Sequence, residues 1–202
     1  MVFNHTSREH PWFLEAMKSA SSPYVNYYRT RQNGVSYGAS GMGRFYKYRR
    51  PDGSVFEYFS AFWEGMPDLN LDNTDVVNEL KDILAFWMNR GVDGFRFDAA
   101  KHAFDPNEMA SGTPTLALNK TFWNDLRRSA RRINPEVYFI GEVLTENLAE
   151  VTAYTGVFDG LFDFPAARQV IDAVRRMSAT GFIQAYSNIY NQYSRISAFQ
   201  SA

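Results

Sequence analysis

The sequence contains no cysteine, which excludes disulfide bonds and metal sites built on thiolates. It has no apolar run long enough to cross a bilayer, so we expect no membrane partner. Neither sign of charge predominates, and a formal net charge of -1 gives no basis for binding nucleic acid. Apolar residues are plentiful, at 45%, which is enough for a substantial globular core.

The stretch at 91–102, G-V-D-G-F-R-F-D-A-A-K-H, predicts a strand that ends at a carboxylate. Side chains alternate along a strand, so Arg96 and Asp98 point to one face while Phe95 and Phe97 point to the other. The arginine can fix the direction of the carboxylate and hold it ionised, as a nucleophile requires. An isolated arginine–aspartate pair of this kind is, however, more often a structural ion pair.

A second carboxylate, Glu142, ends another apolar run, V-Y-F-I-G-E. A helical pattern lies between the two runs, from about Lys120 to Ile133, and Pro135 stops it. Strand, helix and strand form a parallel crossover unit, in which both strands end at the same edge of the sheet. We therefore expect Asp98 and Glu142 to share one cleft.

Three motifs, in this order and spacing, resemble those of the alpha-amylase family of glycoside hydrolases. G-F-R-F-D-A-A-K-H resembles the nucleophile motif of that family, F-I-G-E-V its acid motif, and M-P-D-L-N at 66–70 its additional conserved stretch. The opening V-F-N-H resembles the first motif, whose aspartate would precede Met1. The resemblance covers essentially the whole chain.

The fold class that the resemblance implies is α/β, a TIM (β/α)8 barrel of which this chain covers about strands 3 to 6. Residues 1–5 and 71–202 are assigned to the barrel, and residues 6–70 to a small calcium-associated domain inserted after strand 3. Within the insert, Pro11 predicts the start of a short helix. Alternating segments around the P-D-G turn at 51–53 predict a hairpin, within an otherwise irregular insert.

Two further parts of the barrel are predicted from local patterns. Apolar residues at 76–87 follow helical spacing after a cap at Asn73 or Thr74, and Gly91 ends the helix. Residues 157–164 predict a strand, followed by a helix that begins at Pro165. Residues 179–202 hold Tyr, Asn, Ser and Gln with little periodicity, so no element is assigned there.

By resemblance, Asp98 is the nucleophile, Glu142 is the acid and base, and Arg96 orients Asp98. Retaining glycosidases hold the two carboxylates roughly 5 Å apart. Adjacent parallel strands, about 4.8 Å apart, can supply this separation. His5, Lys101 and His102 would contact the sugar, the last two on the leaving-group side.

The resemblance also implies one cofactor, calcium, with the ligands Asn4, Asp68 and the main-chain carbonyl of His102. A hard cation of this kind takes carboxylate and carbonyl oxygens from separate parts of a chain. Taken by itself, the N-H pair that contains His5 fits a cap equally well, P-D-L-N fits a turn before a helix, and His102 fits a histidine satisfied by the backbone.

The implied reaction is retaining hydrolysis of α-1,4-glucosidic bonds. The expected binding partner is the substrate, a starch-like glucan. An α-glucosidase or transglycosylase of the same family is one alternative, and a catalytically silent sugar-binding or partner subunit is another. The family's third catalytic aspartate follows N-H, and no N-H-D occurs in the sequence. We therefore expect a fragment that needs the remainder of the barrel and has little activity alone. The cellular compartment stays open.

Overall fold

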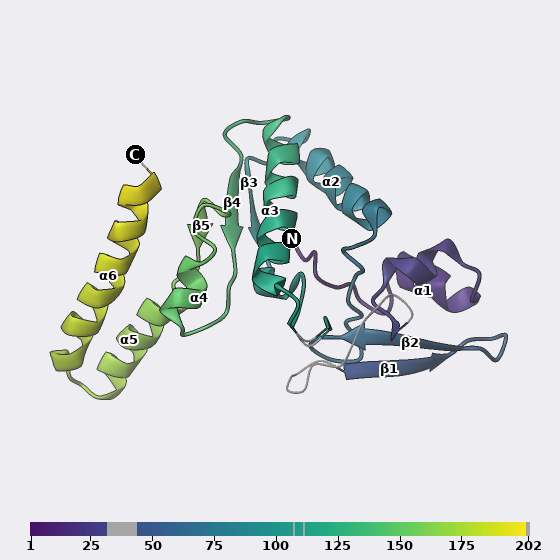
Figure 1. Cartoon of the computed structure of the whole chain (residues 1–202), viewed down its shortest axis with the longest axis horizontal. Coiled ribbons are helices and arrows are strands. Elements are labelled where there is room, and N and C mark those ends of the chain that lie inside the picture. The colour runs from purple at the N-terminus through teal and green to yellow at the C-terminus, as the bar shows by residue number, and fades with distance from the viewer. Residues whose placement is uncertain (32–43, 107, 111, 201–202) are drawn as a thin grey trace.

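The computed structural model of the chain describes residues 1–31, 44–106, 108–110 and 112–200 (Figure 1). A parallel sheet flanked by helices adjoins a smaller part that is built on a two-stranded hairpin. The elements are, in chain order, α1 (Pro11–Lys18), η1 (Pro23–Tyr27), β1 (Arg44–Arg49), β2 (Val55–Ser60), α2 (Thr74–Met88), β3 (Gly94–Phe97), η3 (Ala100–His102), α3 (Thr115–Arg131), β4 (Tyr138–Gly141), α4 (Leu148–Thr152), β5 (Gly160–Leu161), α5 (Phe164–Arg175) and α6 (Thr180–Gln200).

The parallel sheet contains β3, β4 and β5 in that order. Helix α3 connects β3 to β4, which confirms the predicted crossover unit, although it begins at Thr115 rather than near Lys120. The register pairs Phe97 with Gly141. Asp98 and Glu142 are therefore the next residues along two neighbouring strands, at the same edge of the sheet.

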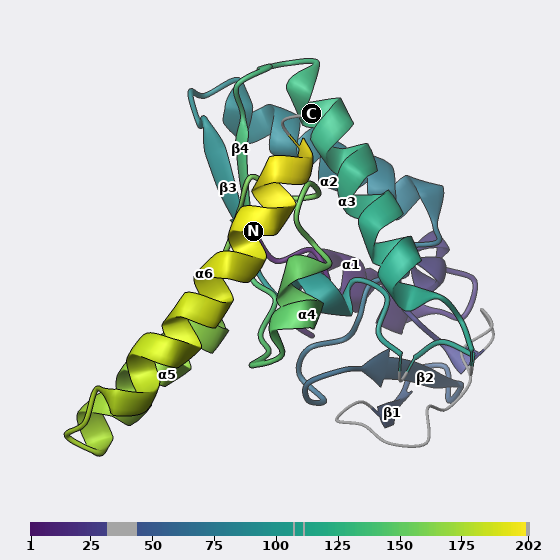
Figure 2. The same ribbon diagram turned by 60° about the vertical axis from the view of Figure 1, so that its left-hand side comes forward.

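Helices α2 and α3 lie side by side against one face of the sheet (Figure 2). An ion pair joins them, with 2.6 Å between Lys81 Nζ and Asp125 Oδ2. As predicted, Asn73 caps α2 by accepting a hydrogen bond from the Asp75 amide. Gly91 follows the helix with φ at +90°, a conformation that strains residues with a side chain. The helix ends as its sequence indicates.

The segment 1–5, assigned to the part of the barrel before the insert, lies beside β3 but forms no strand. The amino group of Met1 donates to the Arg96 carbonyl at 2.6 Å, and the Asp98 amide donates to the Met1 carbonyl at 2.9 Å. His5 then forms an isolated antiparallel bridge with Asp68. The chain leaves β3 and reaches the M-P-D-L-N stretch within a few residues. A ladder of backbone hydrogen bonds between this segment and β3 therefore does not extend.

The segment predicted to be an insert contains the predicted hairpin and helix. Strands β1 and β2 pair antiparallel, and Gly53 takes a positive φ in the turn between them. Phe13 of α1 packs edge-on against Tyr28 and Tyr58, with ring centroids 5.1 Å apart in both pairs. The helix therefore covers one face of the hairpin. The portion of the predicted irregular insert at 32–43 lies outside the described residues.

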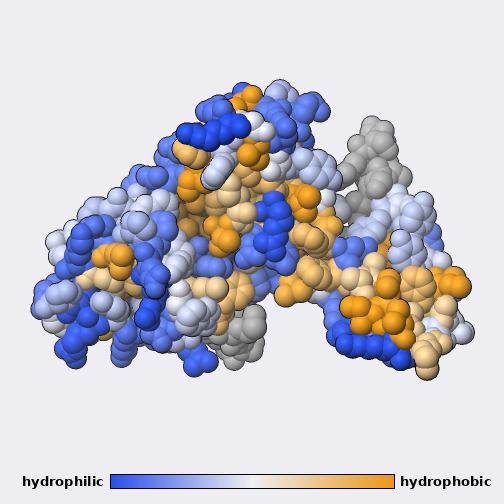
Figure 3. All heavy atoms as spheres, turned by 180° about the vertical axis from the view of Figure 1, so that it is seen from behind, coloured by the Kyte–Doolittle hydropathy of each residue, from blue (hydrophilic) through white to orange (hydrophobic). Residues whose placement is uncertain are grey.

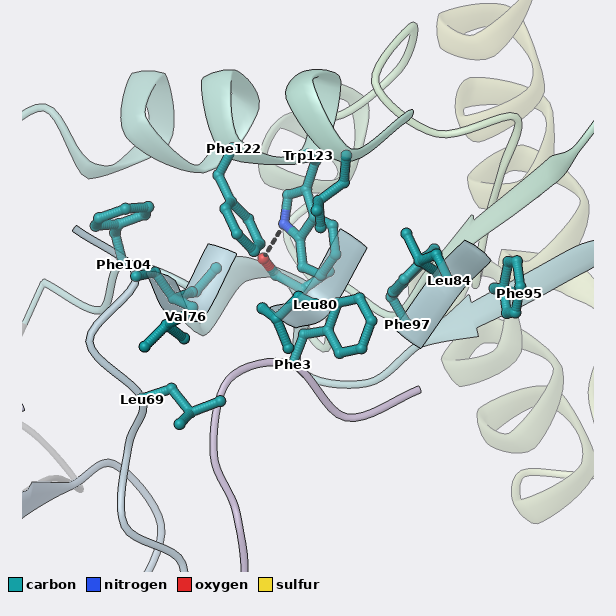
Figure 4. Packing of buried hydrophobic residues seen from close by; sticks show 14 of the residues in the cluster. Phe3, Leu69, Val76, Leu80, Leu84, Phe95, Phe97, Phe104, Phe122 and Trp123 are labelled. Atoms are coloured by element: carbon teal, nitrogen blue, oxygen red, sulfur yellow. Dashed lines mark hydrogen bonds between the residues drawn. The ribbon is translucent and has the colours of Figure 1, made fainter. Parts of the chain in front are cut away.

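The core is continuous from the insert to the sheet, and Phe97 lies near its centre (Figure 4). Phe97 is fully buried, and its ring centroid is 4.6 Å from that of Phe139 and 4.9 Å from that of Trp123. Phe95 is buried too, whereas Arg96 between them is exposed. This confirms the alternation predicted for the strand.

We expect Phe97→Ala to lower the free energy of unfolding by about 3–5 kcal/mol, because the surrounding rings cannot collapse into the space that it leaves. Phe86→Ala is the matched control. Phe86 lies on α2 and is 47% exposed, so its replacement should lower the free energy of unfolding by much less than the replacement of Phe97. Urea denaturation measures both. Equal costs would contradict the assignment of Phe97 to the centre of the core.

The C-terminal part differs most from the sequence-based expectation. Residues 180–200 form one long helix, α6, which packs along α5. Its apolar residues are only partly covered, since Ile183 and Tyr190 are 66% and 64% exposed. Strand β5 is shorter than predicted because Asp163 already caps α5, accepting from the Ala166 amide at 2.9 Å.

Exposed apolar side chains gather at the α5–α6 end and over the centre of the molecule (Figure 3). Within α5 and α6, such residues include Val170, Ile171, Val174, Ile183, Tyr186 and Tyr190. A contiguous apolar surface of this kind usually marks a face that another element or partner covers. None of the helices that the structure describes has the length and hydrophobicity to span a membrane.

Candidate active site

Two carboxylates and one guanidinium occupy the edge of the sheet where β3 and β4 end. Arg96 Nη1 lies 2.6 Å from Asp98 Oδ1, and Arg96 Nη2 lies 2.5 Å from Glu142 Oε2. The arginine extends from the solvent-facing side of β3, and its fork geometry lets it bind both acids at once. The sequence predicted its contact with Asp98 only.

The backbone around the carboxylates is fixed by bonds between the two strand ends. The Glu142 amide donates to the Phe97 carbonyl at 2.9 Å, and the Ala100 amide donates to the Glu142 carbonyl at 2.9 Å. The side chains of Asp98 and Glu142 are 29% and 23% exposed. Both acids are therefore held at the rim of the sheet while their oxygens stay accessible to a ligand.

His5 approaches this edge from the first segment of the chain. Burial lowers the pKa of its imidazole, and the nearby charge of Asp98 opposes this shift to a lesser extent. Phe62 contacts the rings of both His5 and His102 edge-on, with centroids 5.3 Å apart in each case. Phe62 carries no motif signal beyond its place just before M-P-D-L-N, so sequence reasoning missed it.

Lys101 and His102 line a pocket of 480 Å³ beyond the carboxylates. Lys101 Nζ forms an ion pair with Glu150 Oε1 at 3.2 Å, and His102 Nδ1 contacts an Asp105 oxygen. The structure therefore brings the two predicted sugar contacts together, but each already has a protein partner. Glu150 comes from α4, and the sequence did not indicate its part in the pocket.

The three proposed calcium ligands also lie close together. Asp68 is fully buried, and its Oδ1 accepts from the Ala61 amide at 3.1 Å while its Oδ2 has no hydrogen-bond partner. The Asn4 amide nitrogen donates to the His102 carbonyl, and the Leu69 amide donates to the Asn4 carbonyl at 2.8 Å. Burial, followed by the charge of nearby Glu108, raises the pKa of Asp68 well above its usual range.

This donor set fits a hard cation in its chemistry. A buried carboxylate oxygen without a donor is costly, and a cation would satisfy it. The amide of Asn4 would have to turn its oxygen toward a cation that also binds the His102 carbonyl. Among the described residues, no group of three or more histidine, aspartate or glutamate side chains could hold a metal. Any site here therefore depends on amide and main-chain oxygens as well.

Calcium is expected to raise the unfolding temperature if Asn4, Asp68 and His102 bind it, because a ligand that binds only the folded state stabilises it. At a hundredfold excess over Kd the gain is about 2.7 kcal/mol. Asp68→Asn should remove this response, and Asp82→Asn, at an exposed position on α2, should keep it. The measurement is thermal unfolding with calcium and with a chelator. An identical response in both variants would exclude Asp68 as a ligand.

A partly buried ion cluster that the sequence did not reveal lies near this site. Arg29, only 1% exposed, places Nε 3.1 Å from Glu108 Oε1 and Nη1 2.5 Å from Asp72 Oδ2. Burial raises the pKa of Glu108 to about 8, although the charge of Arg29 opposes the shift. The cluster ties the inserted part to the loop after β3. Its three members are far apart in the sequence, so no local pattern marks them.

Comparison with known proteins places this geometry in a family. The family model for the alpha amylase catalytic domain matches residues 1–199. Alpha-amylase 3 of Dictyoglomus thermophilum is 34% identical over 189 residues, which are 91% of this chain and 33% of that protein. Oligo-1,6-glucosidase of Parageobacillus thermoglucosidasius is 37% identical over 119 residues, 56% of this chain and 21% of that protein.

A solved structure agrees with these matches. The crystal structure of the alpha-amylase from H. orenii superposes with a TM-score of 0.74 at 32% identity, and the match covers 96% of this chain and 38% of that one. The prediction that the fold is part of a TIM (β/α)8 barrel is thereby confirmed. The family match over 199 residues and the shared fold lead to one conclusion: this chain belongs to the alpha-amylase catalytic domain family.

Proposed function

We propose that the protein carrying this chain is a retaining glycoside hydrolase that cleaves α-1,4-glucosidic bonds in starch-like glucans. The observation that carries the proposal is the pair of carboxylates, Asp98 and Glu142, at the ends of adjacent parallel strands with Arg96 between them. Two carboxylates flanking one bond are what retaining hydrolysis needs.

In the first step Asp98 attacks the anomeric carbon, and Glu142 gives its proton to the departing glycosidic oxygen. The C–O bond to the leaving sugar breaks as the bond to Asp98 forms, which yields a glycosyl-enzyme. Water then attacks the same carbon, Glu142 takes a proton from it, and Asp98 leaves. Both acids end in their starting states.

Arg96 has a different task toward each acid. Its contact with Asp98 orients the nucleophile for its attack on the sugar. Its contact with Glu142 holds that side chain close to the nucleophile. We assign sugar contacts to His5 and His102, whose rings both contact Phe62. A bound calcium would fix the positions of Asn4, Asp68 and the His102 carbonyl, and it takes no chemical part.

The glucan preference is supported by the alpha-amylase relative, which matches over most of this chain. The similarity to an oligo-1,6-glucosidase supports the alternative of an α-glucosidase that acts on short oligosaccharides. The two are separated by comparing kcat/KM for soluble starch, maltotriose and isomaltose. Preference for isomaltose would overturn the starch assignment and leave the retaining mechanism intact.

We expect the 202-residue chain alone to hydrolyse starch far more slowly than a version extended at both ends. Within the described residues β5 has no strand on its outer side, and α5 and α6 expose apolar residues. Both features indicate surfaces that further barrel elements would cover. Reducing-sugar release by the two versions tests this expectation, and equal turnover would refute it.

A further inference from the structure

The turn that follows Asp98 is held from behind by two side chains of α3. We propose that Asn119 and Trp123 are positioning residues. They hold this turn, and through it both carboxylates, in their catalytic positions. The inference rests on the proposed retaining mechanism and deepens it. Both residues are buried, at 2% and 1% exposed, although Asn119 also borders the pocket that Lys101 and His102 line.

The turn needs support because its backbone is strained. Ala99, directly after Asp98, has φ at +49°, a left-handed conformation that residues with a side chain rarely adopt. This conformation brings the Ala99 amide 3.5 Å from Glu142 Oε2 and lets the Ala100 amide donate to the Glu142 carbonyl at 2.9 Å. The turn therefore touches one acid and immediately follows the other.

Trp123 supports the first half of the turn. Its Nε1 donates to the Ala100 carbonyl at 2.8 Å, as the dashed line in Figure 4 shows. The indole ring also packs against Phe97, with centroids 4.9 Å apart. One side chain thus contacts both the strand that carries Asp98 and the turn after it.

Asn119 supports the second half of the turn. Its Nδ2 donates to the Lys101 carbonyl at 2.8 Å, and its Oδ1 accepts from the Phe104 amide at 2.8 Å. A buried amide with both ends bonded fixes its partners in one arrangement, because any shift would leave a polar group unpaired. Asn119 and Trp123 are four positions apart, on one face of α3, so the helix acts on the whole turn as a unit.

The test separates these hydrogen bonds from packing. Trp123→Phe removes the N–H and keeps an aromatic ring, while Asn119→Asp keeps the acceptor and removes the donor. The controls make the same changes away from the turn, with Trp87→Phe at a 44% exposed position on α2 and Asn124→Asp on α3. The measurements, in the full-length protein, are kcat and KM on an aryl α-maltoside, corrected for the folded fraction, and the unfolding temperature.

We expect kcat to fall by about 10- to 100-fold in each turn variant, because the catalytic groups are displaced from their productive positions. We expect KM to stay within about twofold of the wild-type value. The control variants should keep the wild-type kcat. Turn variants that unfold at lower temperature yet keep kcat per folded molecule would overturn the proposal and leave only a structural role. Either variant decides the question if the other does not fold. A wild-type protein without α-glucosidase or amylase activity would instead overturn the proposed function itself.

Discussion

Asp98→Asn is expected to lower kcat by on the order of 10⁴- to 10⁶-fold, the scale of loss when a covalent nucleophile is removed. An amide cannot form the glycosyl-enzyme, yet it has the shape of the carboxylate. Its oxygen can still accept from Arg96, whose Nη1 lies 2.6 Å from Oδ1 of Asp98. Glucan affinity should therefore change little. The measurements are kcat on starch and the dissociation constant for a maltooligosaccharide, in the full-length protein.

The matched control for this variant is Asp93→Asn. Asp93 is exposed just before the other end of β3 and contacts Asn134, at the opposite edge of the sheet from Asp98. Its replacement should leave turnover unchanged. If Asp98→Asn also kept normal function, the chain would serve as a sugar-binding or partner subunit, for which loss of a nucleophile is of no consequence.

Glu142→Gln should show a loss that depends on the leaving group. Hydrolysis of starch is expected to fall by about 10²- to 10⁴-fold, the usual contribution of a general acid. An aryl α-glucoside whose leaving group needs no proton should lose much less in the first step. The second step would then limit the rate, because no base activates water, and added azide should speed it by attacking the glycosyl-enzyme directly.

The control for Glu142→Gln is Glu136→Gln, at an exposed position before the other end of β4. It should leave the rates on both substrates unchanged. An equal loss on the starch and aryl substrates in Glu142→Gln, without azide rescue, would assign Glu142 a structural role beside Arg96. The two carboxylate variants together therefore distinguish nucleophile from acid, which a single activity loss cannot do.

The two catalytic candidates were predictable because they depend on short-range patterns. Alternation along β3 separates Phe95 and Phe97 from Arg96, and the strand, helix and strand order places Asp98 and Glu142 at one edge of the sheet. Calcium ligation, sugar contacts and the domain division remain predictions. They depend on ligands and on further parts of a barrel.

The sequence by itself determined the parallel crossover, the hairpin and the edge at which the acids meet, because chain geometry converts local periodicity directly into these features. Only the tertiary structure decided that Arg96 binds both acids, that Phe62 lies between His5 and His102, and that Arg29 is buried against Glu108. Apart from the pair of Arg96 and Asp98, each of these contacts joins segments far apart in the chain. Such contacts follow from how whole elements pack against one another, and no spacing of residues along one segment encodes them.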